Sequence, residues 1–185
     1  MHASLADMLT DVVQNSVEAG ADHIHVLFEE SAREIHFSVK DNGKGMSRQT
    51  LEKALDPFWS DGEKHPGRRV GLGLPFLRQT AQQCGGRVDI ESEPEKGTSV
   101  EAFFPADNVD LPPLGDLVLL WMQCLAFEGN YGMNIRRIRR DLSGNGDEYE
   151  IDRNEISAVL GGLEDMNSLG LLREYLQSQE NALNE

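Results

Sequence analysis

The segment IHFSVKDNGKGM (residues 35–46) joins a strand pattern to a glycine-rich turn. Apolar and polar side chains alternate over its first half, which is typical of a β-strand with one buried face. Asp41 ends the strand, and Gly43 and Gly45 follow it two residues apart. A turn without Cβ atoms lets a flat ligand approach the backbone, and the carboxylate can accept a hydrogen bond from an exocyclic amine. An ordinary Asn-Gly turn is the alternative explanation.

Three other segments show the same alternation, at residues 24–28, 88–90 and 100–104. Short turns at 29–33 and 94–97 connect the strands in pairs, as in β-hairpins. Because each strand is apolar on one face only, we expect a mostly antiparallel sheet with helices on a single side.

Helical spacing of apolar residues predicts helices over 5–17, 47–55 and 72–84. Ser47 is suited to cap the second helix, and Pro75 suits the first turn of the third. The sequence therefore predicts a two-layer α/β sandwich. Residues 56–70 follow neither period and are expected to form a long loop of the kind that serves as a functional lid.

Asp11 and Asn15 lie four residues apart in the first expected helix, so their side chains project from the same face. A carboxylate beside a carboxamide can polarise a water molecule and hold a divalent cation. A solvated helix face is the alternative, since surface helices often carry such pairs.

Gly71 and Gly73 stand at the expected start of the third helix. Backbone N–H groups at a helix N-terminus favour phosphate, because they are free to donate and the helix dipole is positive there. Lys64, Arg68 and Arg69 precede them and carry the charge that a phosphate requires. A helix start with incidental glycines is the alternative.

Four motifs occur in order along residues 5–105: DxxxN at 11–15, DxGxG at 41–45, GLGL at 71–74 and GT at 97–98. Their order and spacing resemble the GHKL ATPase superfamily, which includes gyrase-type topoisomerases, heat-shock chaperones, sensor histidine kinases and MutL repair proteins. The resemblance implies the Bergerat fold, an α+β two-layer sandwich that matches the sheet and helices derived above. It also implies ATP and Mg²⁺ as cofactors.

The resemblance gives each motif residue a role. It implies that Asn15 is the magnesium ligand, that Asp41 reads the adenine amino group and that Thr98 supports the adenine through its hydroxyl. The residues that would line the base pocket are Gly43, Gly45 and Met46. The residues that would close over or face the phosphates are Lys64, Arg68, Arg69, Gly71 and Gly73.

Asp11 stands where hydrolysing members of the superfamily usually carry a glutamate as general base, and its side chain is one methylene shorter. Residues 15–21 look like the MutL and gyrase branch, whereas residues 71–105 are closer to histidine kinases. The longer similarity favours a stand-alone histidine kinase-like ATPase domain, either an ATPase or a protein kinase. We expect phosphotransfer to a partner protein or its ATP-dependent regulation. A non-catalytic ATP-gated binding module and a MutL- or gyrase-like ATPase are the alternatives.

A linker at 107–113 separates this ATP-binding domain, residues 1–106, from a second region at 114–185. Helices are expected over 114–127, 135–142, 153–163 and 167–177, as a small helical module for docking or homodimerisation. The basic cluster RRIRR at 136–140 could bind nucleic acid or a phosphorylated partner. The acidic residues around it favour the alternative of a solvated or salt-bridged helix face.

The chain has 185 residues and a formal net charge of −15. Acidity of this size disfavours nucleic acid or an anionic membrane as the main partner, since these surfaces repel the chain. The two cysteines lie far apart, without metal-ligand spacing, and favour a reducing compartment. Without a run of eighteen apolar residues or a signal peptide, the sequence predicts a soluble, cytoplasmic protein.

Overall fold

The computed structural model describes residues 4–56 and 73–184. Lys64, Arg68, Arg69, Gly71 and the expected lid from residue 57 onward lie outside these ranges. The elements, in chain order, are α1 (Leu5–Glu18), β1 (His23–Glu30), β2 (Glu34–Asp41), α2 (Arg48–Ala54), α3 (Gly73–Gln83), β3 (Arg87–Glu93), β4 (Gly97–Pro105), α4 (Leu117–Ala126), β5 (Gly132–Arg140), β6 (Gly146–Asp152), α5 (Arg153–Leu160) and α6 (Met166–Ala182).

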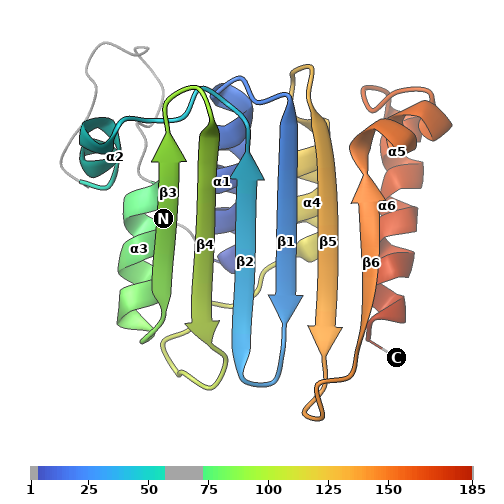
Figure 1. The fold of residues 1–185 in the computed structure, drawn as a ribbon. Helices are drawn as coiled ribbons and strands as arrows, with labels where there is room; N and C mark the ends of the chain where they lie inside the picture. The colour runs from blue at the N-terminus through green and yellow to red at the C-terminus, as the bar shows by residue number, and fades with distance from the viewer. Residues whose placement is uncertain (1–3, 57–72, 185) are drawn as a thin grey trace.

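The strands form one six-stranded sheet in the order β3-β4-β2-β1-β5-β6. Neighbours are antiparallel except β1 and β5, which run parallel. In Figure 1 the helices α1, α3, α4 and α6 all lie behind the sheet, and its front face carries no helix of the described chain. This arrangement confirms the expected α+β sandwich with a mostly antiparallel sheet.

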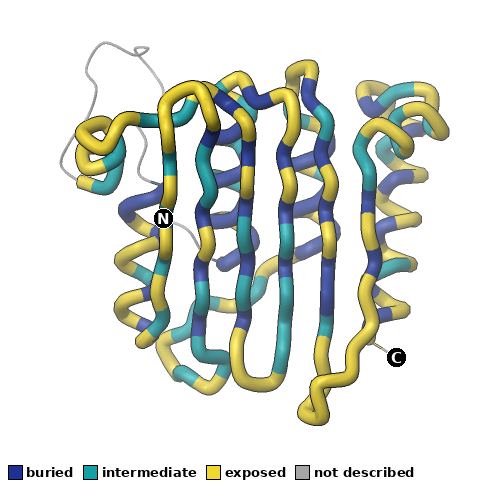
Figure 2. Tube along the Cα trace, in the orientation of Figure 1, coloured by how far each residue is buried: buried dark blue, intermediate teal, exposed yellow. Residues whose placement is uncertain are grey.

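The strands alternate as their sequences predict. Along β2, Ile35, Phe37 and Val39 are buried on the helix side, and the residues between them face the open side. Figure 2 shows the same alternation of buried and exposed positions across the sheet. The helix α1 begins at a capping residue, Ser4, whose Oγ accepts a hydrogen bond from the Asp7 N–H at 3.2 Å. Its apolar face is buried against the sheet.

The helix predicted over 135–142 is wrong, because these residues lie mostly in strand β5. Met133 and Ile135 are buried and Asn134 and Arg136 are exposed, so the period is two. The arginines hid this period, because the core-facing position after Ile135 is held by the charged Arg137. The other predicted helices of the second region are confirmed as α4, α5 and a longer α6.

The second region extends the sheet of the first. β5 pairs with β1 over the whole length of β1, from His23 with Gly132 to Glu30 with Arg139. One core of buried side chains runs through both regions. In it Trp121 of α4 meets the Phe28 ring edge-on, with centroids 6.3 Å apart. The boundary predicted at residue 106 thus falls between two segments that share a sheet and a core.

Candidate functional site

Asp41 lies at the end of β2 with 8% of its surface exposed. Three hydrogen bonds reach its carboxylate from three parts of the chain. Ser16 Oγ on α1 donates to Oδ2 at 2.6 Å, and the backbone N–H of Gly43 donates to Oδ1 at 2.9 Å. The N–H of Thr98, at the start of β4, donates to the same Oδ1 at 3.3 Å. The carboxylate is therefore fixed in one orientation.

The hydrogen bonds on Asp41 leave one acceptor position open. Each carboxylate oxygen can accept about two hydrogen bonds. Among the described residues, Oδ1 already accepts two and Oδ2 accepts one, from Ser16. A buried carboxylate with one unused position suits a single N–H donor from a ligand.

Two glycines allow the backbone around Asp41 to pack closely. Gly45 has φ +58°, and a Cβ there would lie 1.9 Å from the carbonyl oxygen of Glu93. Gly97 has φ +107°, and its Cβ would lie 1.9 Å from the carbonyl oxygen of Asp41 itself. Both distances exclude any side chain. The spacing of the DxGxG and GT motifs is thus required by the contact between the turn after β2 and the β3–β4 hairpin.

Thr98 belongs to a second group of hydrogen bonds beside Asp41. Its hydroxyl lies 2.8 Å from Ser92 Oγ of β3, and either oxygen can be the donor. The same Ser92 Oγ accepts the N–H of Met46 at 2.8 Å and lies 3.2 Å from the Gly97 carbonyl oxygen. Ser92 therefore connects Met46, in the glycine-rich turn, to the Thr98 hydroxyl.

The predicted site residues of α1 each lie near another of the predicted motifs. Asn15 is exposed and directly precedes Ser16, which holds Asp41. Asp11 lies one turn earlier and meets the start of α3, where a Cβ on Gly73 would be 3.1 Å from the Asp11 Cβ. Gly43 lies against α1 too, since a Cβ there would be 2.9 Å from that of Ala19.

Sequence reasoning missed Ser16, Asn42 and Ser92. Asn42 Oδ1 accepts the N–H groups of Asp22 and His23, both at 2.9 Å, and so joins the end of β2 to the start of β1. A signal for Ser16 existed, because it continues the apolar period of α1 with a polar residue. Ser92 had no comparable signal, because its partners meet only when the β3–β4 hairpin packs on the turn after β2.

The described residues fit Mg²⁺ held together with a nucleotide. Mg²⁺ usually takes one or two protein oxygen ligands, with phosphates and waters completing the octahedron. Asn15 offers such an oxygen at the exposed edge of α1. Within residues 4–56 and 73–184, no group of three His, Cys, Asp or Glu side chains could hold a metal alone.

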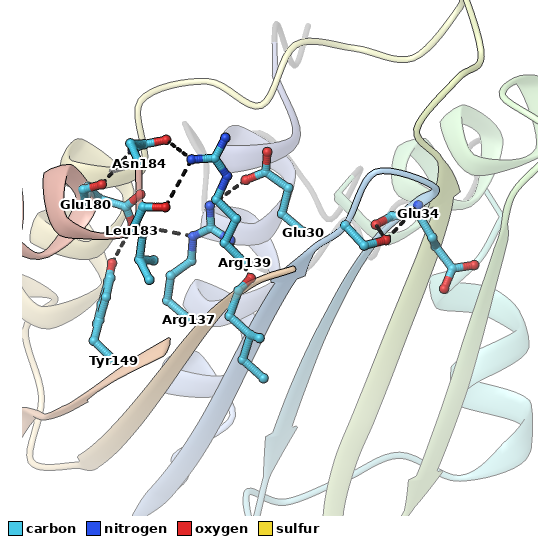
Figure 3. Close-up of polar contacts among 10 residues, drawn as sticks. Glu30, Glu34, Arg137, Arg139, Tyr149, Glu180, Leu183 and Asn184 are labelled. Carbon is cyan, nitrogen blue, oxygen red and sulfur yellow. Dashed lines mark hydrogen bonds and ion pairs between the residues drawn. The ribbon is translucent and has the colours of Figure 1, made fainter. Parts of the chain in front are cut away.

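A separate polar group, which we call the Arg137 cluster, consists of Glu30, Arg137, Tyr149 and Glu180 (Figure 3). Arg137 is 2% exposed; its Nη2 donates to Glu30 at 2.5 Å, and its Nε lies 3.5 Å from Glu180. The Tyr149 hydroxyl donates to Glu180 at 2.5 Å. Burial, and then the Glu180 carboxylate, raise the pKa of Tyr149. The Arg137 cation thus pairs with two carboxylates, although its Nε has no hydrogen-bond partner among the described residues.

The other arginines of the basic cluster also have partners. Arg136 donates to Glu148 at 2.8 Å, and Arg140 forms an ion pair with Glu29 at 2.5 Å. Arg139 donates to the Leu183 carbonyl oxygen at 3.1 Å and to the Asn184 side chain, at the end of α6 (Figure 3). These contacts support the salt-bridged alternative for the basic cluster. The cluster lies on strand β5 and not on the predicted helix.

The fold and the site define an ATP-binding domain. A family profile described as Histidine kinase-, DNA gyrase B-, and HSP90-like ATPase matches residues 2–108. The chain belongs to this family. It contains an ATP-binding, histidine kinase-like ATPase domain of the GHKL superfamily.

Several curated relatives are named as kinases. The chain is 29% identical to sporulation kinase A of Bacillus subtilis over 103 residues, which is 55% of this chain and 16% of that protein. It is 34% identical to the sensor kinase CckA of Brucella abortus over 92 residues, 50% of this chain and 10% of the relative. The sensor histidine kinase ZraS of Escherichia coli is 28% identical over 113 residues, 60% of this chain and 23% of that protein. The chain thus matches less than a quarter of each relative.

Among solved structures, the N-terminal domain of a DNA repair protein has a similar fold. Its TM-score is 0.53 at 16% identity, over 91% of this chain and 59% of that one. No helix in the described ranges is long and apolar enough to cross a membrane.

Proposed function

We propose that this chain binds Mg²⁺-ATP where α1, β2 and β4 meet, and uses it for phosphotransfer to, or ATP-dependent regulation of, a partner protein. The observation that carries the proposal is the buried Asp41 carboxylate, held by Ser16, Gly43 and Thr98 with one acceptor position unused. The 6-amino group of adenine supplies the single donor that this position accepts. The Gly43–Met46 turn forms the wall of the base pocket.

In this proposal, the residues that would face the phosphates lie along α1 and at the start of α3. Asn15 offers its side-chain oxygen to the metal, and Gly73 leaves room beside Asp11. Gly71, Lys64, Arg68 and Arg69 bind the phosphates in this proposal. When bound, Mg²⁺ neutralises charge that develops on the transferred phosphoryl group. Asp11 takes the proton from the attacking group as general base.

The phosphoryl acceptor lies on a partner protein in this proposal. The described histidines, His23, His25 and His36, are on strands β1 and β2. His36 stacks on Phe103, with ring centroids 4.2 Å apart. None of the three lies on a helix of the kind that carries a phosphoacceptor in the histidine kinase resemblance. The second region, which we propose is a docking or dimerisation surface, would bring the partner to the site.

Binding and turnover of labelled ATP with Mg²⁺ test the proposal separately. Asp41→Asn places an N–H₂ donor opposite the adenine amine, so we expect ATP affinity to fall by about thirtyfold or more. Asp89→Asn, an equivalent change on the open face of β3, should leave affinity unchanged. Equal affinity in the Asp41 variant would contradict the proposed site.

Turnover distinguishes the proposed activities once binding is established. Asp11→Asn should abolish ATP consumption while ATP binding is retained. Transfer of label to an added partner would identify a kinase, and phosphate release without transfer would identify a MutL- or gyrase-like ATPase. Binding without turnover in the unaltered chain, with or without partners, would overturn the catalytic proposal in favour of an ATP-gated binding module.

A further inference from the structure

Ser16 is the one polar side chain in the buried face of α1 after its capping residue. The other buried side chains of the helix are apolar, and Ser16 is only 3% exposed. A buried hydroxyl must form a hydrogen bond or destabilise the fold. The Ser16 hydroxyl donates a hydrogen bond to Oδ2 of Asp41 at 2.6 Å, and the two residues are 25 positions apart in the sequence. Helix packing alone does not require a serine there.

The Ser16 bond differs from the other two bonds on Asp41. Gly43 and Thr98 donate backbone N–H groups to Oδ1, so those bonds are retained when side chains change. Ser16 is the side-chain donor to Oδ2 among the described residues. Oδ2 is also the oxygen with the unused acceptor position. The orientation of the ligand-facing oxygen therefore depends on one hydroxyl group.

We infer that Ser16 is a positioning residue that sets base specificity by holding Oδ2 of Asp41 toward the 6-position of the purine; this rests on the proposed function. With Ser16 present, Oδ2 accepts one further donor in one direction. A 6-amino group supplies that donor. A 6-oxo group presents lone pairs to the carboxylate and is rejected. Without Ser16, the two N–H bonds still hold Oδ1 but no side-chain donor from the described residues holds Oδ2, and the distinction weakens.

The probes are ATP, which carries a 6-amino group, and inosine triphosphate, which carries a 6-oxo group and a hydrogen on the neighbouring N1. The unaltered chain should bind ATP about thirtyfold more tightly than inosine triphosphate. In Ser16→Ala, we expect ATP affinity to fall about tenfold and inosine triphosphate affinity to change little. Ser16→Thr keeps the hydroxyl and should recover the preference for ATP. Ser38→Ala, on the open side of the same strand as Asp41, is the matched control and should change neither affinity.

A role in folding alone would lower both affinities equally, so the ratio of the two dissociation constants is the decisive readout. An equal loss of both in Ser16→Ala, while the unaltered chain prefers ATP, would overturn the inference and leave the proposed function intact. An unaltered chain that binds both nucleotides equally, or neither, would overturn both. A double-mutant cycle adds a second measurement: Ser16→Ala in an Asp41→Asn background should change the ratio no further, because the serine acts through that carboxylate.

Discussion

The Asp41 site and the Arg137 cluster both bury charge, but they differ in what that charge contacts. Arg137 lies between two carboxylates and also donates to the Ile138 carbonyl oxygen at 2.7 Å. The Asp41 carboxylate accepts three hydrogen bonds from described residues and has room for a fourth. A buried carboxylate that is held by neutral donors and keeps an acceptor position among the described residues indicates a binding site, whereas a buried cation placed between two carboxylates indicates a structural contact.

Changing Gly97 should have the largest effect on stability at the Asp41 site. Gly97→Ala forces a Cβ to 1.9 Å from the Asp41 carbonyl oxygen at φ +107°. We expect a loss of about 4 kcal/mol or more in the free energy of unfolding, measured by chemical denaturation. Gly170→Ala in α6 is the control, because nothing lies within 4 Å of its Cβ. That helix should gain up to about 1 kcal/mol. Similar results for both variants would contradict the close packing described here.

Disrupting the Arg137 cluster should have the second-largest effect on the free energy of unfolding. Arg137→Met leaves Glu30 and Glu180 without their cation, and we expect a loss of about 3 kcal/mol in the free energy of unfolding. Adding Glu30→Gln and Glu180→Gln should recover part of that loss, since the uncompensated charges are then removed. Because the cluster is structural, folded protein of either variant should keep its ATP affinity. A large loss of ATP affinity in a fully folded variant would contradict this, because it would show that the Arg137 cluster is coupled to the Asp41 site.

The half-exposed ion pair of Arg136 should contribute much less. Water screens its contact with Glu148, so Arg136→Ala should cost much less stability than Arg137→Met, and high salt should reduce the difference. Thermal melts at low and high ionic strength measure it. A loss as large as that of Arg137→Met would refute the distinction between buried and exposed arginines drawn from the comparison.

The smallest effect is a pH dependence at the start of α6. Asp165 caps this helix, and hydrogen bonds from the Ser168 hydroxyl and N–H lower its pKa from 3.8. A carboxyl with a lowered folded-state pKa stabilises the protein above its unfolded pKa, and this is lost as the pH falls through the folded value. Asp165→Asn keeps a cap without the charge. Its unfolding free energy should therefore fall less than that of the unaltered chain on acidification below about pH 4. An equal fall would contradict the charged cap.

Much of the fold could be predicted from the alternation of apolar residues. Strands β1 to β4 and helix α1 follow simple periods, because each buries one regular face. Strand β5 could not be recognised, since its core-facing position 137 is an arginine whose partners, Glu30 and Glu180, are distant in sequence. A buried charge is predictable only when its partners are known, and tertiary packing alone brings them together.

The same reasoning separates the predicted and missed parts of the site. Asp41, Gly43 and Gly45 belong to one short motif, so their spacing was informative. Ser16 acts through Asp41 across 25 residues, and Ser92 acts through Thr98 and Met46. A hydroxyl group that supports a motif from another element does not lie at a fixed distance from that motif in the sequence. Such residues can be identified only from the fold.

The decisive measurement is calorimetry of Mg²⁺-ATP binding to the folded unaltered chain and to folded Asp41→Asn. It tests whether Asp41 forms the nucleotide site. We expect clear binding by the unaltered chain and a loss of about thirtyfold or more in the variant, which should remain folded in the absence of nucleotide. Equal binding by both proteins, or binding by neither, would contradict this expectation.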